Sequence, residues 1–554
     1  MKNNLLLPGL KQLLTVMLLA LVVFETPAFA DEDYFPETIA GLTEHSFDQK
    51  EKVIDVLIQK TGQQKETDDR VLDLLQAFLN GKLYYIKSDR KIVYFHEVNG
   101  KNKIVSAADN QNLSGLEKHD LKKITVNNKL RRKLRSLIAE LSLANKKPEV
   151  RLAAVKQMMD AVTAESVENI RRHLETEKNE KVVEAMKTLL AMVEVNSTDK
   201  TLRIAALENL GSSLEPKARN RVVSILEKDD KGDYIEADKD IVNAALKAKI
   251  KIDDRRKVYS FLEKIFFGLS LGSVLLLAAI GLAITFGVMG VINMAHGELI
   301  MIGAYTTYVV QLLMPDHIGL SLLVSVPAAF IVSGLFGIAI ERSVIRFLYG
   351  RPLETLLATF GISLILQQLV RTIFSPLNRS VETPAWMSGA LEINPVFFIT
   401  YNRLTIVFFS LVVFALLMLI LKRTSLGLKV RAVSQNRSMA RAMGIRSEWV
   451  DAMTFGLGSG IAGIAGVALS QLTNVGPNLG QSYIIDSFLV VVFGGVGNLW
   501  GTLVGAMSLG VFNKFLEPET GAVLAKILIL VFIILFIQKK PRGLFPQKGR
   551  AAEN

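Results

Sequence analysis

Repeated apolar stretches fill the second half of this 554-residue sequence, and they limit the folds open to the chain more than any other feature. A helix needs about 20 mainly apolar residues to cross a bilayer. The apolar segments lie near residues 264–288, 298–314, 320–341, 354–374, 403–421, 452–471, 484–495, 498–513 and 522–538. The seventh and eighth are short. This half therefore predicts a polytopic α-helical membrane protein with about eight or nine spans, some of them broken.

Charge and composition separate this half from the residues before it. Up to about residue 255 the chain is rich in Lys, Glu and Asp. A formal charge of +12 could indicate nucleic acid, but the densest basic clusters border the apolar segments, which is the pattern of the positive-inside rule. We therefore expect no nucleic-acid partner. The absence of cysteine excludes disulfides, thiolate metal sites and a cysteine nucleophile.

The N-terminus has the three parts of a secretory signal peptide. Lys2 and Lys11 precede the apolar run 13–24, and Ala28-Phe29-Ala30 matches a cleavage site of the A-x-A kind. A first transmembrane helix is the alternative, but the run is short and ends in small and helix-breaking residues. We expect a signal peptide over residues 1–30, which would place residues 31–255 in the periplasm.

The exported region divides into two parts by its periodicity. Residues 31–130 predict an α+β region, because helical patterns give way to a small antiparallel sheet between residues 82 and 127. Residues 131–255 predict stacked helical hairpins of the HEAT type, because similar segments with paired alanines recur. Those segments are Glu149–Val155, Thr201–Leu207, Asp240–Leu246 and, more weakly, Lys181–Met186. The histidines here are scattered and predict no metal site.

Basic loops predict the orientation of the membrane half, residues 256–547. Arginines and lysines crowd residues 342–351, the loop 422–446 and the tail that ends with residues 548–554. Such segments stay in the cytoplasm. The connection 375–402 then falls on the opposite side.

Two glycine-containing segments interrupt the apolar runs, at residues 286–298 and 493–498. Irregular backbone at membrane depth is tolerated only inside the protein or beside a water-filled cavity. Paired breaks in the two halves therefore predict a translocation path. The candidate residues of this path are Asn293, His296, Glu298, Asp486 and Asn498. Capping of helix ends is an equally open reading of the first three, and Asp486 could instead lie at the external interface.

Four stretches resemble the permease subunits of the branched-chain amino-acid and urea class of ABC importers. They are residues 286–305 (FGVMGVINMAHGELIMIGAY), 354–367 (ETLLATFGISLILQ), 424–445 (TSLGLKVRAVSQNRSMARAMGI) and 493–505 (FGGVGNLWGTLVG). The resemblance covers about residues 260–547. Residues 485–492 and the long exported extension resemble the urea branch, so urea is the expected substrate. A branched-chain amino acid or a short-chain amide is the alternative.

The resemblance implies a complex with a related second permease, two cytoplasmic ATPases and a periplasmic binding protein in the inner membrane. The sequence has no P-loop, so we expect no enzyme activity and no cofactor in this chain. The loop 422–446 would dock on the ATPases, with residues 439–445 as its coupling helix. The docking candidates are Arg437, Met439, Arg441, Met443, Gly444 and Ile445.

Two other kinds of protein remain open. A membrane-anchored periplasmic sensor would use the exported region to bind its ligand, but only sixteen residues follow Gln538 as a cytoplasmic output. A stand-alone channel or a secondary transporter would need no ATPase. Co-purification of ATPase subunits and a binding protein would favour the importer.

Overall fold

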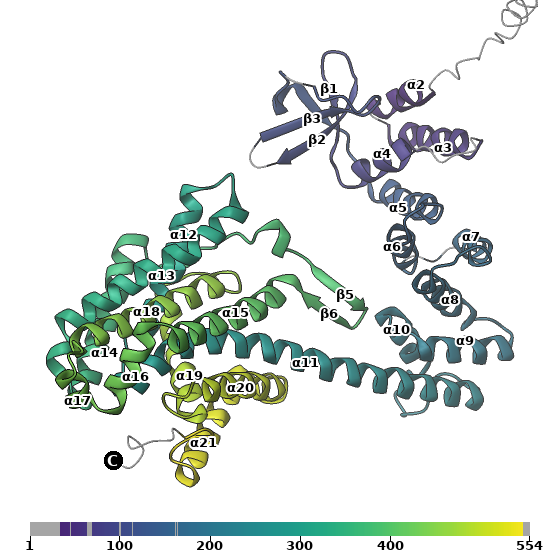
Figure 1. Cartoon of the computed structure of the whole chain (residues 1–554). Coiled ribbons are helices and arrows are strands. Elements are labelled where there is room, and N and C mark those ends of the chain that lie inside the picture. The colour runs from purple at the N-terminus through teal and green to yellow at the C-terminus, as the bar shows by residue number, and fades with distance from the viewer. Residues whose placement is uncertain are drawn as a thin grey trace, which may run out of the picture. The chain divides into compact units, whose positions relative to one another are not determined.

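The computed structural model describes residues 34–546 apart from residues 45, 64–68, 99–100, 114, 161 and 163. Contacts divide the chain into two units (Figure 1): the first extends to Ala248, and the second comprises Lys249 onward together with the short piece Leu214–Pro216. The predicted signal peptide and the tail 548–554 lie outside the described residues and stay predictions, as do the predicted domain boundaries.

The first unit begins with helices packed on a small sheet. The helices are α2 (Tyr34–Ala40), η1 (Gly41–Thr43), α3 (Phe47–Gln63) and α4 (Asp69–Leu79). The strands are β1 (Leu83–Ile86), β2 (Ile92–Val98), β3 (Lys101–Ser106) and β4 (Leu121–Lys123), with η2 (Lys118–Asp120) before the last. They pair antiparallel in the order β3-β2-β1-β4. The predicted small antiparallel sheet is confirmed.

Both faces of this sheet are covered. Successive strand residues point to opposite faces, and in β2 Ile92 and Tyr94 join the core formed with α4, while Val93 and Phe95 join a second cluster with Leu121. The four consecutive residues 92–95 of this strand are therefore all used in packing. The polar residues between β1 and β2 form the turn that the sequence predicts.

Short helices make up the rest of the first unit. They are α5 (Asn128–Leu143), α6 (Pro148–Met158), α7 (Ala164–Leu174), α8 (Glu180–Glu194), α9 (Lys200–Ser212) and α10 (Pro216–Ile225). Asn127, Asn179 and Asp199 accept hydrogen bonds from the first turns of α5, α8 and α9, which fixes where these helices begin. The helices α5, α6, α8 and α9 pack in sequence, as expected for stacked hairpins.

An ion pair supports this stack. Arg151 of α6 donates from Nε to Oε2 of Glu177 at 2.6 Å and from Nη2 to Oε1 at 2.8 Å. This hydrogen bonding to Arg151 lowers the pKa of Glu177 to about 2. The pair therefore stays charged at neutral pH and ties α6 to the connection between α7 and α8.

Nine helices coincide with the nine predicted apolar segments, and all but the start of the first lie in the second unit. They are α11 (Lys239–Met289), α12 (His296–Leu313), α13 (Ile318–Ser343), α14 (Pro352–Phe374), α15 (Tyr401–Arg423), α18 (Ser447–Ser470), α19 (Leu479–Gly494), α20 (Leu499–Thr520) and α21 (Ala522–Lys539). The connections contain η3 (Ile345–Leu348), η4 (Ala385–Met387), the hairpin β5 (Ala390–Asn394) and β6 (Phe397–Thr400), α16 (Ser425–Gln435) and α17 (Arg437–Ala442).

Seven helices in the described part of the chain are long and apolar enough to cross a membrane. The two that fall short are α12 and α19, and α19 has only 16 residues. The predicted eighth segment is not short, since α20 has 22 residues. The reason for α12 is composition: His296, Glu298 and Gln311 lower its mean hydropathy, although its first half is buried.

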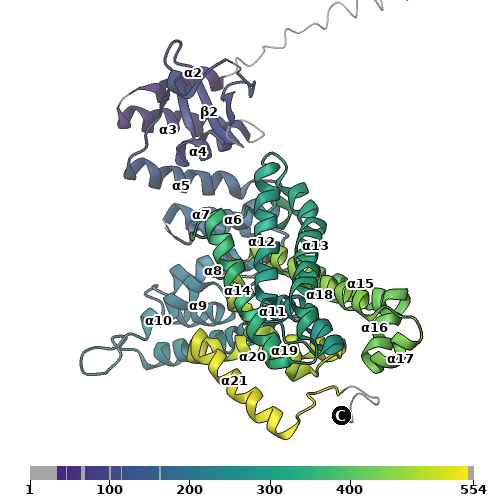
Figure 2. The same ribbon diagram turned by 90° about the vertical axis from the view of Figure 1, so that its left-hand side faces the viewer.

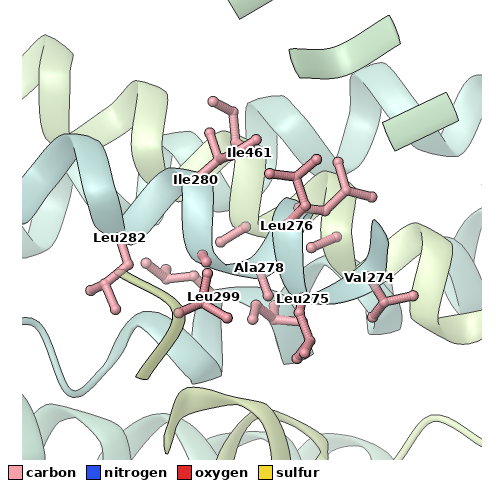
Figure 3. Packing of buried hydrophobic residues seen from close by; sticks show 14 of the residues in the cluster. Val274, Leu275, Leu276, Ala278, Ile280, Leu282, Leu299 and Ile461 are labelled. Carbon is pink, nitrogen blue, oxygen red and sulfur yellow. The ribbon is translucent and has the colours of Figure 1, made fainter. Parts of the chain in front are cut away.

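The core of the second unit lies around α18. This helix packs on α12 and α13, and α12 runs beside α13 and α14 (Figure 2). Side chains of α11 such as Ile280 and Leu282 pack with Leu299 of α12 and Ile461 of α18 (Figure 3). The outer faces of α13, α14, α15 and α21 expose large apolar side chains, as expected of surfaces in contact with lipid.

Candidate functional site

The first glycine-containing break separates α11 from α12. α11 ends at Met289, Gly290 takes a φ of +67°, and α12 begins at His296. The amide of Met294 donates to Oγ1 of Thr359 at 3.1 Å, and Oδ1 of Asn293 accepts from the amide of Ala295 at 3.0 Å. Side chains therefore satisfy backbone groups that a continuous helix would have paired.

Glu298 is buried in the first turn of α12 and faces α14. Its Oε1 accepts hydrogen bonds from Oγ of Ser363 at 3.0 Å and from Nε2 of Gln367 at 2.7 Å. Its Oε2 has no hydrogen-bond partner among the described residues. The carboxyl group is therefore held through one oxygen, and the other keeps its capacity to accept a hydrogen bond.

Asn293 and His296 supply two more available groups in the same break. Both side chains are buried. Nε2 of His296 lies 2.9 Å from the carbonyl oxygen of Ala278 in α11, so this nitrogen carries the proton and Nδ1 is an acceptor. Within the described chain, Nδ1 of His296 and Nδ2 of Asn293 have no partner. The break thus presents one amide donor, one imidazole acceptor and one carboxyl oxygen.

Sequence reasoning missed the partners of these groups on α14. Thr359, Ser363 and Gln367 stand four residues apart and therefore share one face of the helix. The same spacing continues to Thr355 and Arg371. A polar residue at every fourth position of an otherwise apolar helix is the signal that would have predicted this face.

The second break separates α19 from α20, and Asn498 caps the start of α20. Gly495 and Gly497 take φ angles of +106° and +78°. Oδ1 of Asn498 accepts from the amides of Trp500 and Gly501 at 3.1 and 3.2 Å, and its Nδ2 donates to the carbonyl of Phe545 at 3.2 Å. Asn498 is therefore fully occupied as the N-cap of α20.

The two breaks lie against each other. A Cβ atom on Gly287 would lie 2.3 Å from the Cα of Gly497, which is closer than any side chain allows. The last turn of α11 therefore meets the connection between α19 and α20 backbone to backbone, although the two segments are far apart in the sequence. Glycine at position 287 permits this approach, and the positive φ of Gly497 also favours glycine there.

Asp486 lies apart from this contact. Its Oδ2 pairs with Nζ of Lys526 on α21 at 3.0 Å. The pair lines a cavity of about 220 Å³ together with Tyr483, Lys514 and Glu517. The structure thus groups Asn293, His296 and Glu298, and it places Asp486 and Asn498 in other surroundings.

The predicted coupling helix is α17, which begins two residues earlier than expected and ends at Ala442. The side chain of Asn436 accepts from the amide of Met439 at 2.9 Å and caps the start. Gly444 takes a φ of +84° just beyond the end, as expected of a glycine that terminates a helix.

The predicted docking residues point in two directions. Met439 and Met443 are exposed at 60% and 77%, and Arg441 is exposed as well. Ile445 instead packs against the cluster of buried residues between α16 and α18, and Arg437 pairs with Asp451 inside the same chain. Arg437 is therefore not free to meet a carboxylate on a partner.

Comparison with known proteins places residues 264–537 in a family described as branched-chain amino acid transport system / permease component. The permease protein BraD of a high-affinity branched-chain amino acid transport system from Pseudomonas aeruginosa is 31% identical over 297 residues, which are 52% of this chain and 96% of that protein. LivH of Salmonella typhimurium is 30% identical over 295 residues, 51% of this chain and 95% of its own length. A probable LivH of Methanocaldococcus jannaschii is 27% identical over 295 residues, with shares of 49% and 88%. No solved structure matches.

Proposed function

The chain belongs to the family of branched-chain amino acid transport permease components, and from this premise we propose that it is the membrane-spanning permease subunit of an ATP-driven importer for a small polar solute. The observation that carries the proposal is the contact between the two glycine breaks. Within the first break, Asn293, His296 and Glu298 each keep one hydrogen-bonding atom without a partner among the described residues. A polar solute crossing the bilayer needs such groups to replace its lost water.

The proposed substrate is urea. Urea is small and neutral, with two amide-like NH₂ groups and one carbonyl oxygen. Nδ2 of Asn293 has no partner among the described residues and can donate to the carbonyl oxygen of urea. Nδ1 of His296 and Oε2 of Glu298 can accept from its NH₂ groups. The resemblance of residues 485–492 to the urea branch supports the same choice.

A branched-chain amino acid is the second candidate. The names of the relatives concern the transport of these amino acids, and this observation alone favours the alternative. Such a solute carries an ammonium group, for which the buried Glu298 would be the partner. Short-chain amides are neutral, as urea is, and carry an apolar group, as a branched-chain amino acid does.

The proposed complex contains a related second permease, two cytoplasmic ATPases and a periplasmic binding protein. ATP hydrolysis belongs to the partner subunits, because the sequence has no P-loop. The exposed Met439, Arg441 and Met443 on and beside α17 form the surface that we assign to ATPase docking. Flexible apolar methionines beside a cation suit a groove with carboxylates at its rim.

The proposed topology follows the positive-inside rule. The loop that contains α16 and α17 lies in the cytoplasm with the C-terminus, and residues 31–255 lie in the periplasm. Loops at the opposite ends of the spans, such as the β5–β6 hairpin, then face the periplasm.

Uptake by cells tests the substrate. Cells that carry the whole transport system should accumulate labelled urea, and deletion of this chain alone should lower the initial rate of that uptake. Labelled leucine, measured in the same cells, gives the second arm.

The two arms separate the candidates. Loss of leucine uptake with unchanged urea uptake would assign the chain to branched-chain amino acids and reject urea. Unchanged uptake of both solutes and of acetamide would contradict an importer for this class of solute. Restoring the wild-type chain in the deleted cells is the control for loss of expression of the other subunits.

A further inference from the structure

Arg437 and Asp451 form an ion pair between the start of α17 and the first turns of α18. Asp451 is only 3% exposed. Nη1 of Arg437 lies 3.3 Å from Oδ1 of Asp451, and Nη2 contacts Oδ2, so the pair is bidentate. The guanidinium group also lies 3.8 Å from the ring centroid of Tyr349. Because a buried carboxylate needs a paired cation, this arrangement fixes Arg437 in one position.

The helix that Arg437 begins is too short to hold itself in place. α17 has six residues, and an isolated helix of this length is not stable in water. Its inner face contributes Ala440 to a small apolar cluster with Val450, and Nε of Arg441 donates to Oγ of Ser447 at 2.6 Å. The ion pair and the hydrogen bond from Arg441 are therefore polar links between α17 and α18, and the ion pair is the one that involves a buried charge.

α18 continues this link into the centre of the unit. A Cβ on Gly466 would lie 2.1 Å from the carbonyl oxygen of Ile300 in α12, and one on Gly463 would lie 2.4 Å from that of Ala329 in α13. Backbones at this separation have no space to slide independently. A displacement of α18 must therefore displace α12, whose first turn holds Glu298.

We infer that the Arg437–Asp451 pair is a positioning latch that makes α17 move with α18 and so connects a partner docked on Met439 and Met443 to the buried groups around Glu298. The inference rests on the proposed function. Neither residue meets the solute or the partner. Breaking the pair should leave docking in place and separate ATP hydrolysis from transport.

The test uses proteoliposomes that contain the complete complex and the loaded binding protein. It measures the labelled urea or leucine moved per ATP hydrolysed, in the wild type and in each variant. Arg437→Gln and Asp451→Asn should each lower this ratio roughly fivefold or more, in the range of measured coupling between contacting residues. The ATPase subunits should still co-purify in wild-type amounts. Arg437→Lys, which keeps the charge, should retain more of the ratio than Arg437→Gln.

The exchanged pair, Arg437→Asp with Asp451→Arg, tests whether the ratio depends on the pairing itself and not on either residue alone. The double variant should move more solute per ATP hydrolysed than either Arg437→Asp or Asp451→Arg alone. Glu519→Gln removes an exposed charge near the end of α20 and should leave the ratio unchanged.

Three outcomes would overturn the latch. The first is a normal ratio in Asp451→Asn, and the second is loss of the ATPases from the Arg437→Gln complex, which would give the pair a role in assembly. The third is a wild-type complex without ATP-linked uptake, which would reject the proposed function and the latch with it. The first two outcomes leave the proposed function intact, so the two failures are distinguishable.

Discussion

Glu298 shows how the structure separates two readings that the sequence leaves open. A carboxylate in the first turn of a helix is stabilised by the helix dipole and often caps the free amides. Oε1 of Glu298 instead accepts from Ser363 and Gln367 on α14, and the N-cap of α12 has no side-chain hydrogen bond. The side chain therefore joins two helices and does not cap its own.

The sequence predicts Asn293, His296 and Glu298 because polar residues at membrane depth stand out locally. It could not predict that Ser363 and Gln367 are the partners of Glu298, since pairing between helices depends on tertiary packing. Asn498 stands out for the same reason as Asn293, but two hydrogen bonds from the first turn of α20 make it a cap and a third joins it to the carbonyl of Phe545. Local polarity thus identifies a break without identifying which groups remain free.

Substitution of Glu298 tests its role at this scale. Glu298→Gln keeps an oxygen for Ser363 and Gln367, so assembly should be normal, while uptake should fall about tenfold or more because a hydrogen bond to a carboxylate is worth about 1.5–3 kcal/mol. Glu298→Ala should lower uptake at least as far. Labelled-solute uptake and the amount of assembled complex are measured together.

The matched control is Glu354→Ala, which removes an exposed glutamate at the start of α14. Its uptake should equal that of the wild type. Wild-type uptake by Glu298→Gln would remove Glu298 from the translocation path and leave it a purely structural link.

At the scale of elements, the length of an apolar run predicts helix position well and helix length less well. All nine predicted segments coincide with helices. α20 is longer than its apolar run, because it continues through Lys514 and Glu517, which form an i,i+3 ion pair at 2.5 Å. α12 can carry polar residues in its first turn because this turn is buried within the protein and does not face lipid.

The contact between the breaks gives a prediction for the helix pair. Gly287→Ala should force Gly497 away and lower the stability of the complex by about 1–3 kcal/mol, as overpacking does. Uptake should fall with it. Thermal unfolding in detergent and uptake by cells are the measurements.

Gly361→Ala is the matched control, because a Cβ there meets no atom within 4 Å. Alanine also has the higher helix propensity, so this variant should be as stable as the wild type or slightly more stable. Equal stability of both variants would contradict backbone contact between the two breaks.

At the scale of the whole molecule, the sequence predicts a division into an exported region and a membrane region, and contacts divide the chain near Ala248. The composition shift makes this division visible, since charged helices and apolar helices need different solvents. The side of the membrane stays a prediction, because it depends on the signal peptide and the basic loops. Seven candidate spans also exceed what the anchor of a sensor requires.

ATP-driven accumulation tests the central claim, that this chain is the permease subunit of an importer. Proteoliposomes should contain the complete complex, with the loaded binding protein on one side and ATP on the other. The account predicts that labelled urea or leucine reaches a higher concentration inside than outside only when ATP is hydrolysed. Equilibration of the solute without ATP, in vesicles that contain this chain alone, would identify a channel or a secondary transporter and contradict the account.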